Sequence, residues 1–341
     1  MSTDLIDENR RAPLRSLTGV QILATGSYVP ECVVTNDDLH ARLGFDSNWI
    51  VQRTGIRERR HAPLEMATSD LAVRAARRCI ERAGVKASDI DLVLVGTFTP
   101  DMSFPATACL VQNQLGIRAP AVDLQAACAG FMYALVIGSQ FIGTGCSKLA
   151  LVIGADCNSR ILNPKDSHTY PLFGDGAGAV LLAAGGPEQG LVSYTLGSDG
   201  SGGDLLCRRM GGSRMPISSD MLDEGVQYMR MDGRAVFKWA VRLLDESIRA
   251  VLDKAGLAPG DIDLVILHQA NVRIIYAATD VTQIDRGKVF LNLDRYGNTS
   301  AGSVPLALDE AYQQGRIRRG DRILLSGFGA GLAWGTAVFR W

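Results

Sequence analysis

The sequence lacks the marks of several large classes of protein. Its formal net charge at pH 7 is only −1, which argues against a chain built mainly to bind nucleic acid. Its longest nearly apolar run, residues 129–138, is far shorter than the roughly 18 residues that a helix needs to span a bilayer. The N-terminal segment has no apolar stretch of the kind found in secretory signals. We therefore expect a cytoplasmic protein that engages neither nucleic acid nor a membrane.

Metal and nucleotide motifs are missing as well. The seven cysteines contain no CxxC pair, and their odd number does not fit a complete disulfide framework, so we expect reduced thiols and no metal site. The glycine-rich segments FGDGAGA (173–179) and GFGAGLAWG (327–335) do not have the GxGxxG spacing, and no GxxxxGK occurs. Neither a Rossmann site nor a P-loop is therefore predicted. These glycines serve either an oxyanion hole made of backbone N–H groups or the tight packing of strands.

The chain contains an internal repeat. AGVKASDIDLVLV (83–95) is similar to AGLAPGDIDLVIL (255–267) at an offset of 172 residues, and KLALVIGAD (148–156) corresponds to DRILLSGFG (321–329) at an offset of 173. Matched segments in the same order and at nearly one spacing indicate two homologous halves. We predict an N-terminal extension (1–17), a first half (18–185) and a second half (186–341), the two halves being related by a pseudo-two-fold axis.

Helical and strand patterns alternate within each half. Residues 69–84 have apolar positions at helical spacing, a Ser-Asp start and a glycine stop. Residues 130–143 are apolar on nearly all sides, which predicts a helix buried in a middle layer. The Val/Ile/Leu runs between such helices predict mostly parallel sheets covered on both faces. The predicted fold class is therefore α/β, a duplicated five-layer α/β/α/β/α arrangement.

Cys128 is the first candidate for chemistry. It lies between the end of a predicted strand (121–125) and the start of the apolar helix. The N–H groups and dipole of that helix would favour a thiolate, which is the nucleophile that acyl transfer from a thioester needs. The alternative is a small buried thiol that fills core space.

Two polar residues of the second half are further candidates. His268 ends the second copy of the repeated strand, and ligands gather at such strand ends in α/β sheets. Asn298 lies two residues before Ser300, the counterpart of Cys128 at the offset of 172. If the pseudo-two-fold holds, the helix starts of both halves meet at the axis and bring these residues together. The alternatives are a hydrogen-bonded core histidine and a Gly-Asn turn.

A set of motifs, in a fixed order from about residue 18 to the C-terminus, carries a family resemblance. They are GSYVP (26–30), WIVQRTGIRERR (49–60), AACAGF (126–131), FGDGAGA (173–179), HQAN (268–271), GNTSAGSVP (297–305) and WG (334–335). Together they resemble β-ketoacyl-acyl-carrier-protein synthase III, the initiating condensing enzyme of type II fatty-acid synthesis, in the thiolase-fold superfamily.

The resemblance implies a catalytic triad of Cys128, His268 and Asn298. It implies an oxyanion hole made by the backbone N–H groups of Cys128 and Ala330. In the implied reaction, Cys128 takes an acyl group from acyl-CoA, and malonyl-acyl-carrier protein then loses CO2 and attacks the acyl-cysteine. The implied partners are these two substrates and a second copy of the chain in a homodimer. No metal or redox cofactor is implied, since coenzyme A enters as a substrate thioester.

The resemblance also implies binding residues. These are Trp49, Arg53, Arg160, Gly233, Phe237 and Asn271 for coenzyme A, Phe104 for the partner's acyl pocket, and Lys238 and Arg273 for the carrier protein. One departure bears on docking, because the family commonly has two lysines where this chain has Asp280 and Val281. A related enzyme of secondary metabolism with another acceptor is therefore an alternative. An inactive acyl-CoA-binding protein is a more remote one.

Overall fold

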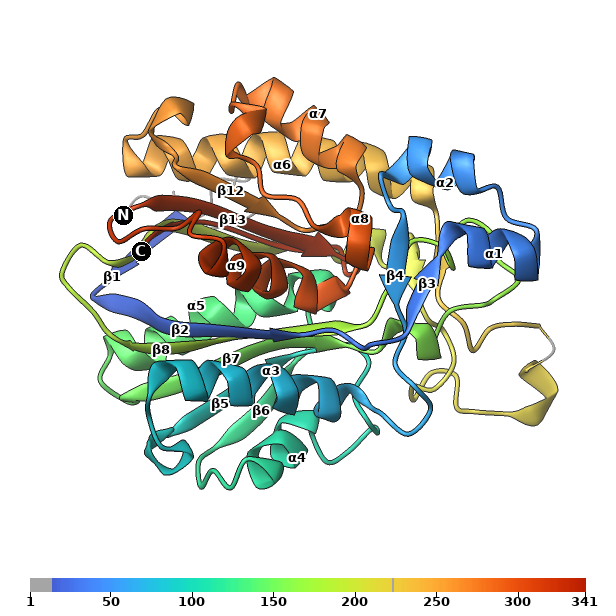
Figure 1. Ribbon diagram of the computed structural model, residues 1–341, viewed down its shortest axis with the longest axis horizontal. Coiled ribbons are helices and arrows are strands. Elements are labelled where there is room, and N and C mark those ends of the chain that lie inside the picture. The colour runs from blue at the N-terminus through green and yellow to red at the C-terminus, as the bar shows by residue number, and fades with distance from the viewer. Residues whose placement is uncertain (1–13, 223) are drawn as a thin grey trace, which may run out of the picture.

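The computed structural model describes residues 14–222 and 224–341. Two five-stranded sheets face each other, with two helices between them and further helices on each outer face (Figure 1). This arrangement confirms the predicted α/β/α/β/α fold class and its internal duplication. Among the described residues, no helix is both long enough and apolar enough to cross a membrane.

Each of the two large sheets has five strands. The first sheet contains, in order, β2 (Val20–Tyr28), β8 (Gly176–Ala184), β7 (Leu149–Asp156), β5 (Leu92–Gly96) and β6 (Ala121–Leu124). The second contains β1 (Leu14–Thr18), β9 (Gly190–Ser198), β14 (Ala333–Arg340), β13 (Arg322–Gly329) and β12 (Leu264–Leu267). Two small sheets pair β3 (Val33–Thr35) with β4 (Glu58–Arg60), and β10 (Leu206–Cys207) with β11 (Arg230–Met231).

The helices complete the layers (Figure 1). The outer face of the first sheet carries α3 (Thr68–Ala83) and α4 (Thr107–Gln114), and that of the second carries α6 (Gly233–Ala255) and α7 (Val272–Thr282). The middle layer holds α5 (Gly130–Gly143) and α9 (Ser303–Gln313). Three short helices, α1 (Asn36–Leu43), α2 (Ser47–Thr54) and α8 (Leu293–Tyr296), complete the set in the described chain. Because α5 has a sheet on each side, most of its apolar residues are buried, as its composition predicted, although Phe141 near its end is exposed.

The prediction of mostly parallel sheets was wrong. Only β5 with β6, β5 with β7, and β12 with β13 are parallel, and the other neighbours in the two sheets are antiparallel. Parallel neighbours need a crossover segment, usually a helix, which α4 and α5 supply in the first half. The chain returns from β13 to β14 through a tight turn, so that pair is antiparallel.

Strand β1 places part of the predicted N-terminal extension in the second sheet. It pairs with β9 along its length, from Leu14 opposite Thr195 to Thr18 opposite Gly190. The chain then crosses to the first sheet as β2. Residues 14–17, which we grouped with an extension, therefore contribute to the sheet of the second half. Residues 1–13 of that predicted extension lie outside the described residues.

Glycines let each middle helix approach the sheet of the opposite half. A Cβ on Gly154 of β7 would overlap the Ala301 carbonyl oxygen, and one on Gly327 of β13 would lie 3.2 Å from the Cys128 carbonyl oxygen. Gly178 and Gly335, which pair with these two glycines across the ladders, meet the starts of α9 and α5 in the same way. Tight packing therefore explains glycines in both glycine-rich motifs.

The same contacts correct the predicted register of the repeat. Ala127 and Ser300 both have a positive φ, 45° and 55°, and each opens a single 3-10 turn that runs directly into α5 or α9. The counterpart of Cys128 is therefore Ala301, not Ser300. The offset is 172 between β5 and β12 and 173 at these turns, because the second half has one more residue between strand and turn.

Candidate active site

Cys128 lies at the boundary between the two halves. It follows β6 in the 3-10 turn that leads into α5, and only 4% of its surface is exposed. Two segments of the second half reach it. The Ser300 Oγ lies 3.2 Å from the Cys128 Sγ, and a Cβ on Gly329 would lie 3.2 Å from the same sulfur. The cysteine is therefore packed against β13 and against the start of α9.

The structure does not favour a thiolate at this cysteine in the absence of substrate, contrary to our expectation. Burial raises the pKa of the Cys128 thiol to about 12, and the charge of Asp156 adds to the rise. The hydrogen bond from Ser300 acts in the opposite direction, as does a backbone donor, but both are outweighed. Removal of water disfavours a charged sulfur more than the helix start favours it.

His268 follows β12 and is buried beside the same turn. Its Nδ1 lies 2.6 Å from the Ser303 Oγ, and the Phe328 ring packs edge-on against the imidazole at 5.2 Å. Burial lowers the pKa of His268 to about 3, so the ring is neutral near pH 7. Because Ser303 occupies Nδ1, the nitrogen that remains for a substrate is Nε2.

The side-chain amide of Asn298 has a fixed orientation. Its Oδ1 accepts a hydrogen bond from the Ser300 N–H at 2.8 Å, and only the oxygen of an amide can accept from an N–H. Its Nδ2 therefore remains as a donor. The Asn298 backbone is held by Leu172 and Gly174, since its N–H donates to the first and its carbonyl accepts from the second. The segment beginning at Phe173 thus also serves to position Asn298.

One short segment, residues 298–303, connects the three predicted catalytic residues. Asn298 begins it, Ser300 contacts Cys128, and Ser303 contacts His268. The sequence reasoning chose Asn298 but missed the two serines. The repeat had already aligned this segment with the cysteine turn, and that alignment was the signal that could have identified them.

Asp156 is a second residue that the sequence reasoning missed. It lies at the end of β7, is fully buried, and its Oδ1 accepts hydrogen bonds from Thr97, Thr99 and the Phe98 N–H. Its Oδ2 accepts from the Ala301 N–H at 3.0 Å. Burial raises its pKa, while these donors lower it. The carboxyl therefore ties the strand ends of the first half to the 298–303 segment of the second.

Several residues predicted to bind coenzyme A lie together. Trp49 and Arg53 belong to α2, and the Asn271 Nδ2 donates to the Arg53 carbonyl at 3.1 Å. Asn271 also caps α7 by accepting from the Arg273 N–H. The Arg273 guanidinium lies over the ring of Phe237, on α6, at 5.5 Å. The starts of α6 and α7 thus meet the end of α2 (Figure 1).

The other residues predicted to bind coenzyme A, the acyl group or the carrier protein lie at other positions on the surface. The Arg160 guanidinium donates to the carbonyls of Pro63 and Met66, whereas Gly233 is the exposed first residue of α6. Phe104 precedes α4 and is 84% exposed. Lys238 is exposed on α6.

The acidic residue at the predicted docking position is paired. Asp280 accepts hydrogen bonds from two nitrogens of Arg286, at 2.9 and 2.5 Å. This arginine lowers the pKa of the Asp280 carboxyl, and its guanidinium also lies 4.4 Å from the Tyr276 ring centre. The departure from the family pattern therefore adds little unpaired negative charge to α7.

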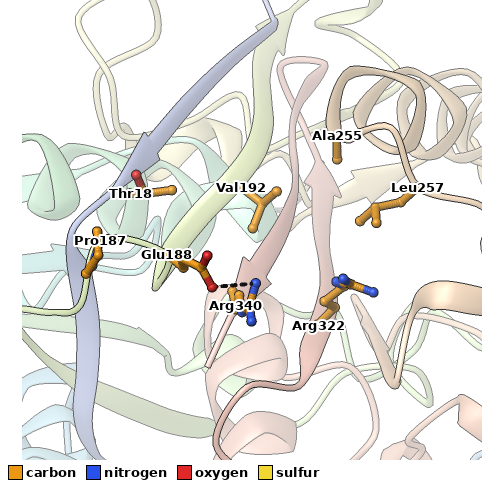
Figure 2. A pocket seen from close by; sticks show the side chains of 8 residues that line it. All are labelled: Thr18, Pro187, Glu188, Val192, Ala255, Leu257, Arg322 and Arg340. Carbon is orange, nitrogen blue, oxygen red and sulfur yellow. Dashed lines mark ion pairs between the residues drawn. The ribbon is translucent and has the colours of Figure 1, made fainter.

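A separate hollow lies far from these residues. It has a volume of about 350 Å³ and is lined by Thr18, Pro187, Glu188, Val192, Ala255, Leu257, Arg322 and Arg340 (Figure 2). Glu188 and Arg340 form an ion pair across it at 3.0 Å. Arg322 begins β13, whereas the Gly329 end of the same strand meets Cys128. The hollow therefore lies at the end of β13 that is opposite to the end beside Cys128, and no predicted site residue lines it.

A buried cysteine at the start of a middle-layer helix, linked through one short segment to an imidazole and a carboxamide in a duplicated five-layer fold, is typical of the condensing enzymes with the thiolase fold. Comparison with known proteins gives the family. Residues 122–200 match the family model for 3-oxoacyl-[acyl-carrier-protein] synthase III, and residues 252–341 match the model for its C-terminal part. The chain belongs to the β-ketoacyl-[acyl-carrier-protein] synthase III family and is a condensing enzyme, as the motifs predicted.

Individual relatives cover nearly the whole chain. The β-ketoacyl-[acyl-carrier-protein] synthase III of Rhodopirellula baltica is 55% identical over 96% of this chain and 99% of its own length. The crystal structure of the Thermus thermophilus enzyme is 43% identical, with a TM-score of 0.88 over 94% of this chain and 98% of that one. That of the Aquifex aeolicus enzyme is 42% identical, with a TM-score of 0.86 over 95% and 100%.

Proposed function

We propose that this chain condenses an acyl-CoA primer with malonyl-acyl-carrier protein through an acyl-Cys128 intermediate. The products are 3-oxoacyl-acyl-carrier protein, CO2 and coenzyme A. The observation that carries the proposal is the 298–303 segment, which contacts Cys128 through Ser300 and His268 through Ser303, and which supplies Asn298. This shared segment supports a site in which a nucleophile and two neutral donors act together.

The first half-reaction transfers the acyl group to the cysteine. The Cys128 sulfur attacks the thioester carbon, the bond from that carbon to the coenzyme A sulfur breaks, and coenzyme A leaves as a thiol with the cysteine's proton. The oxyanion of the tetrahedral intermediate would accept the backbone N–H groups of Cys128 and Ala330. The contact between Gly329 and the Cys128 backbone supports this pairing, because Ala330 follows directly.

The second half-reaction forms the carbon–carbon bond. The malonyl carboxylate leaves as CO2, and the resulting enolate carbon attacks the acyl-cysteine carbonyl, which releases Cys128. While the enolate exists, its oxygen would accept hydrogen bonds from the Asn298 Nδ2 and the His268 Nε2. A neutral imidazole, with its pKa lowered to about 3 by burial, suits a hydrogen-bond donor better than a general base near pH 7. The sequence of steps needs no metal or redox cofactor.

Coenzyme A would bind where α2, α6 and α7 meet. The contacts of Asn271 with Arg53 and of Arg273 with Phe237 support a common binding surface there. Trp49 would stack on the adenine, Arg53 and Arg160 would pair with phosphates, and Gly233, Phe237 and Asn271 would line the pantetheine path. The acidic carrier protein would then dock on Lys238 and Arg273.

The enzyme would act as a homodimer. Strand β6 is an edge strand of the first sheet, and Val122 on it is exposed, as is Phe104 on the neighbouring loop. Exposed apolar groups beside an unpaired strand edge are typical of a surface that another chain covers. In a dimer joined there, Phe104 would close the partner's acyl pocket.

The reaction is tested by following the two parts of the malonyl group, the carboxylate that leaves and the two carbons that remain in the product. The enzyme is incubated with acyl-CoA and with malonyl-acyl-carrier protein labelled at the carboxylate. The proposal predicts equal amounts of labelled CO2 and of 3-oxoacyl-acyl-carrier protein. Formation of acyl-acyl-carrier protein without CO2 would instead indicate simple acyl transfer, the activity expected of a relative with another acceptor.

A further inference from the structure

The Cys-His-Asn triad leaves two buried serines of the 298–303 segment without a role. We propose that Ser300 is a further catalytic residue, which stabilises the Cys128 thiolate during acylation, and that Ser303 is a positioning residue, which fixes the proton of His268 on Nε2. The proposal rests on the proposed function: Ser300 acts in the steps in which the Cys128 sulfur carries charge, whereas Ser303 acts only in the condensation half-reaction.

Ser300 is held against the nucleophile. It is fully buried, with its Oγ 3.2 Å from the Cys128 Sγ. Its φ of 55° lies in the left-handed region, which is unfavourable for a residue other than glycine, asparagine or aspartate. Two neighbours hold it there, since its N–H donates to the Asn298 Oδ1 and the next N–H, of Ala301, donates to Asp156. The equivalent turn of the first half opens with the same positive φ at Ala127, so this conformation belongs to the turn, and in the second half it holds the hydroxyl against the sulfur.

The Ser300 hydroxyl reduces the cost of placing a negative charge on the buried Cys128 sulfur. Before the S–C bond forms, the Cys128 proton must leave, and negative charge develops on a buried sulfur beside the Asp156 carboxyl. A hydroxyl that donates to the sulfur stabilises this charge, because hydrogen bonds to a charged acceptor are roughly twice as strong as neutral ones. The effect is confined to acylation and to the release of Cys128, the steps in which the sulfur carries charge.

Ser303 acts on the other catalytic side chain. A neutral imidazole has one N–H, and its position is set by the partner of the other nitrogen. When the Ser303 hydroxyl donates to the His268 Nδ1 at 2.6 Å, the ring proton is on Nε2. This is the form that can donate to an enolate oxygen. Without the hydroxyl, the proton is free to move to Nδ1, and the nitrogen facing the substrate becomes an acceptor.

The test measures the half-reactions separately in Ser300→Ala, Ser303→Ala and a control variant. Ser139→Ala is the control, because Ser139 on α5 is equally buried and its hydroxyl has no hydrogen-bond partner. Acylation is followed by the mass of the intact protein with acyl-CoA alone. Condensation is followed by mixing fully acylated enzyme with malonyl-acyl-carrier protein. All variants are first matched to the wild type in thermal unfolding, and Ser303→Thr, which keeps the hydroxyl, serves as a rescue variant.

The expected result is a separation of effects. Ser300→Ala slows acylation roughly 10- to 100-fold, and Ser303→Ala slows condensation by a similar factor while acylation stays near the wild-type rate. In the Ser303→Ala variant, 15N NMR of labelled histidine also shows loss of the Nε2-protonated form of His268. The control keeps both rates, and Ser303→Thr recovers more than half of the loss in Ser303→Ala on a logarithmic scale.

Three outcomes overturn the proposal. Wild-type acylation in Ser300→Ala refutes the role of Ser300. Wild-type condensation in Ser303→Ala, or an unchanged tautomer of His268, refutes the role of Ser303. A wild-type enzyme that takes no acyl group at all refutes the proposed function itself and, with it, the basis of this division.

Discussion

The buried imidazole of His268 makes a quantitative prediction about stability. Burial lowers its pKa from 6.5 to about 3, so between these values the unfolded chain binds a proton that the folded chain does not. Stability therefore rises with pH in this window and is lost as the pH falls below 6.5. One pKa unit corresponds to about 1.4 kcal/mol, so protonation of the unfolded state costs about 2 kcal/mol of folding stability at pH 5 relative to pH 7.

The measurement compares the wild type with His268→Gln in urea unfolding at the two pH values. Glutamine does not titrate, while every other ionisable group is common to both proteins and cancels in the difference. We expect the wild type to lose about 2 kcal/mol more than the variant between pH 7 and pH 5. An equal loss in both proteins would mean that His268 binds a proton as readily in the folded enzyme as in the unfolded chain, and that burial does not lower its pKa.

Three further predictions concern the site and its surfaces. Gly329→Ala places a Cβ 2.9 Å from the Cys128 backbone nitrogen, so the turn must shift; we expect acylation to slow at least about 10-fold in a stopped-flow assay, and an unchanged rate would contradict the close approach. Phe104→Asp should shift the protein from dimer to monomer in analytical ultracentrifugation, unless this surface is not the interface. Lys238→Glu, at an exposed position, should raise KM for malonyl-acyl-carrier protein about 10-fold or more without slowing acylation by small acyl-CoAs, and an unchanged KM would place docking elsewhere.

The layered architecture could be predicted from the sequence because the duplication repeats strand segments that can be recognised in both halves. The repeated 83–95 and 255–267 segments correspond to the regions around β5 and β12, and the all-apolar 130–143 segment is the middle helix α5. Whether neighbouring strands are parallel or antiparallel could not be predicted from the same patterns. It depends on whether a crossover or a tight turn joins neighbours, and apolar runs alone do not distinguish the two cases.

The candidate site could be predicted only in part, for reasons that are physical. Cys128, His268 and Asn298 stand out because polar or reactive groups interrupt apolar patterns at element ends. Ser300 and Ser303 do not, since small hydroxylated residues are common at helix starts, and the one-residue difference in offset misaligned them. The raised pKa of Cys128 could not be read from the sequence either, because it depends on burial and on Asp156, a residue that lies 28 positions away along the chain.

The central claim is that Cys128 carries the acyl group between coenzyme A and the malonyl-derived carbon. It is tested most directly by the intact mass and peptide map of the enzyme after incubation with a panel of acyl-CoAs. The account predicts one added acyl mass per chain, located on Cys128, absent in Cys128→Ala and discharged when malonyl-acyl-carrier protein is added. An acyl group found on another residue, or one that persists unchanged in Cys128→Ala, would contradict it.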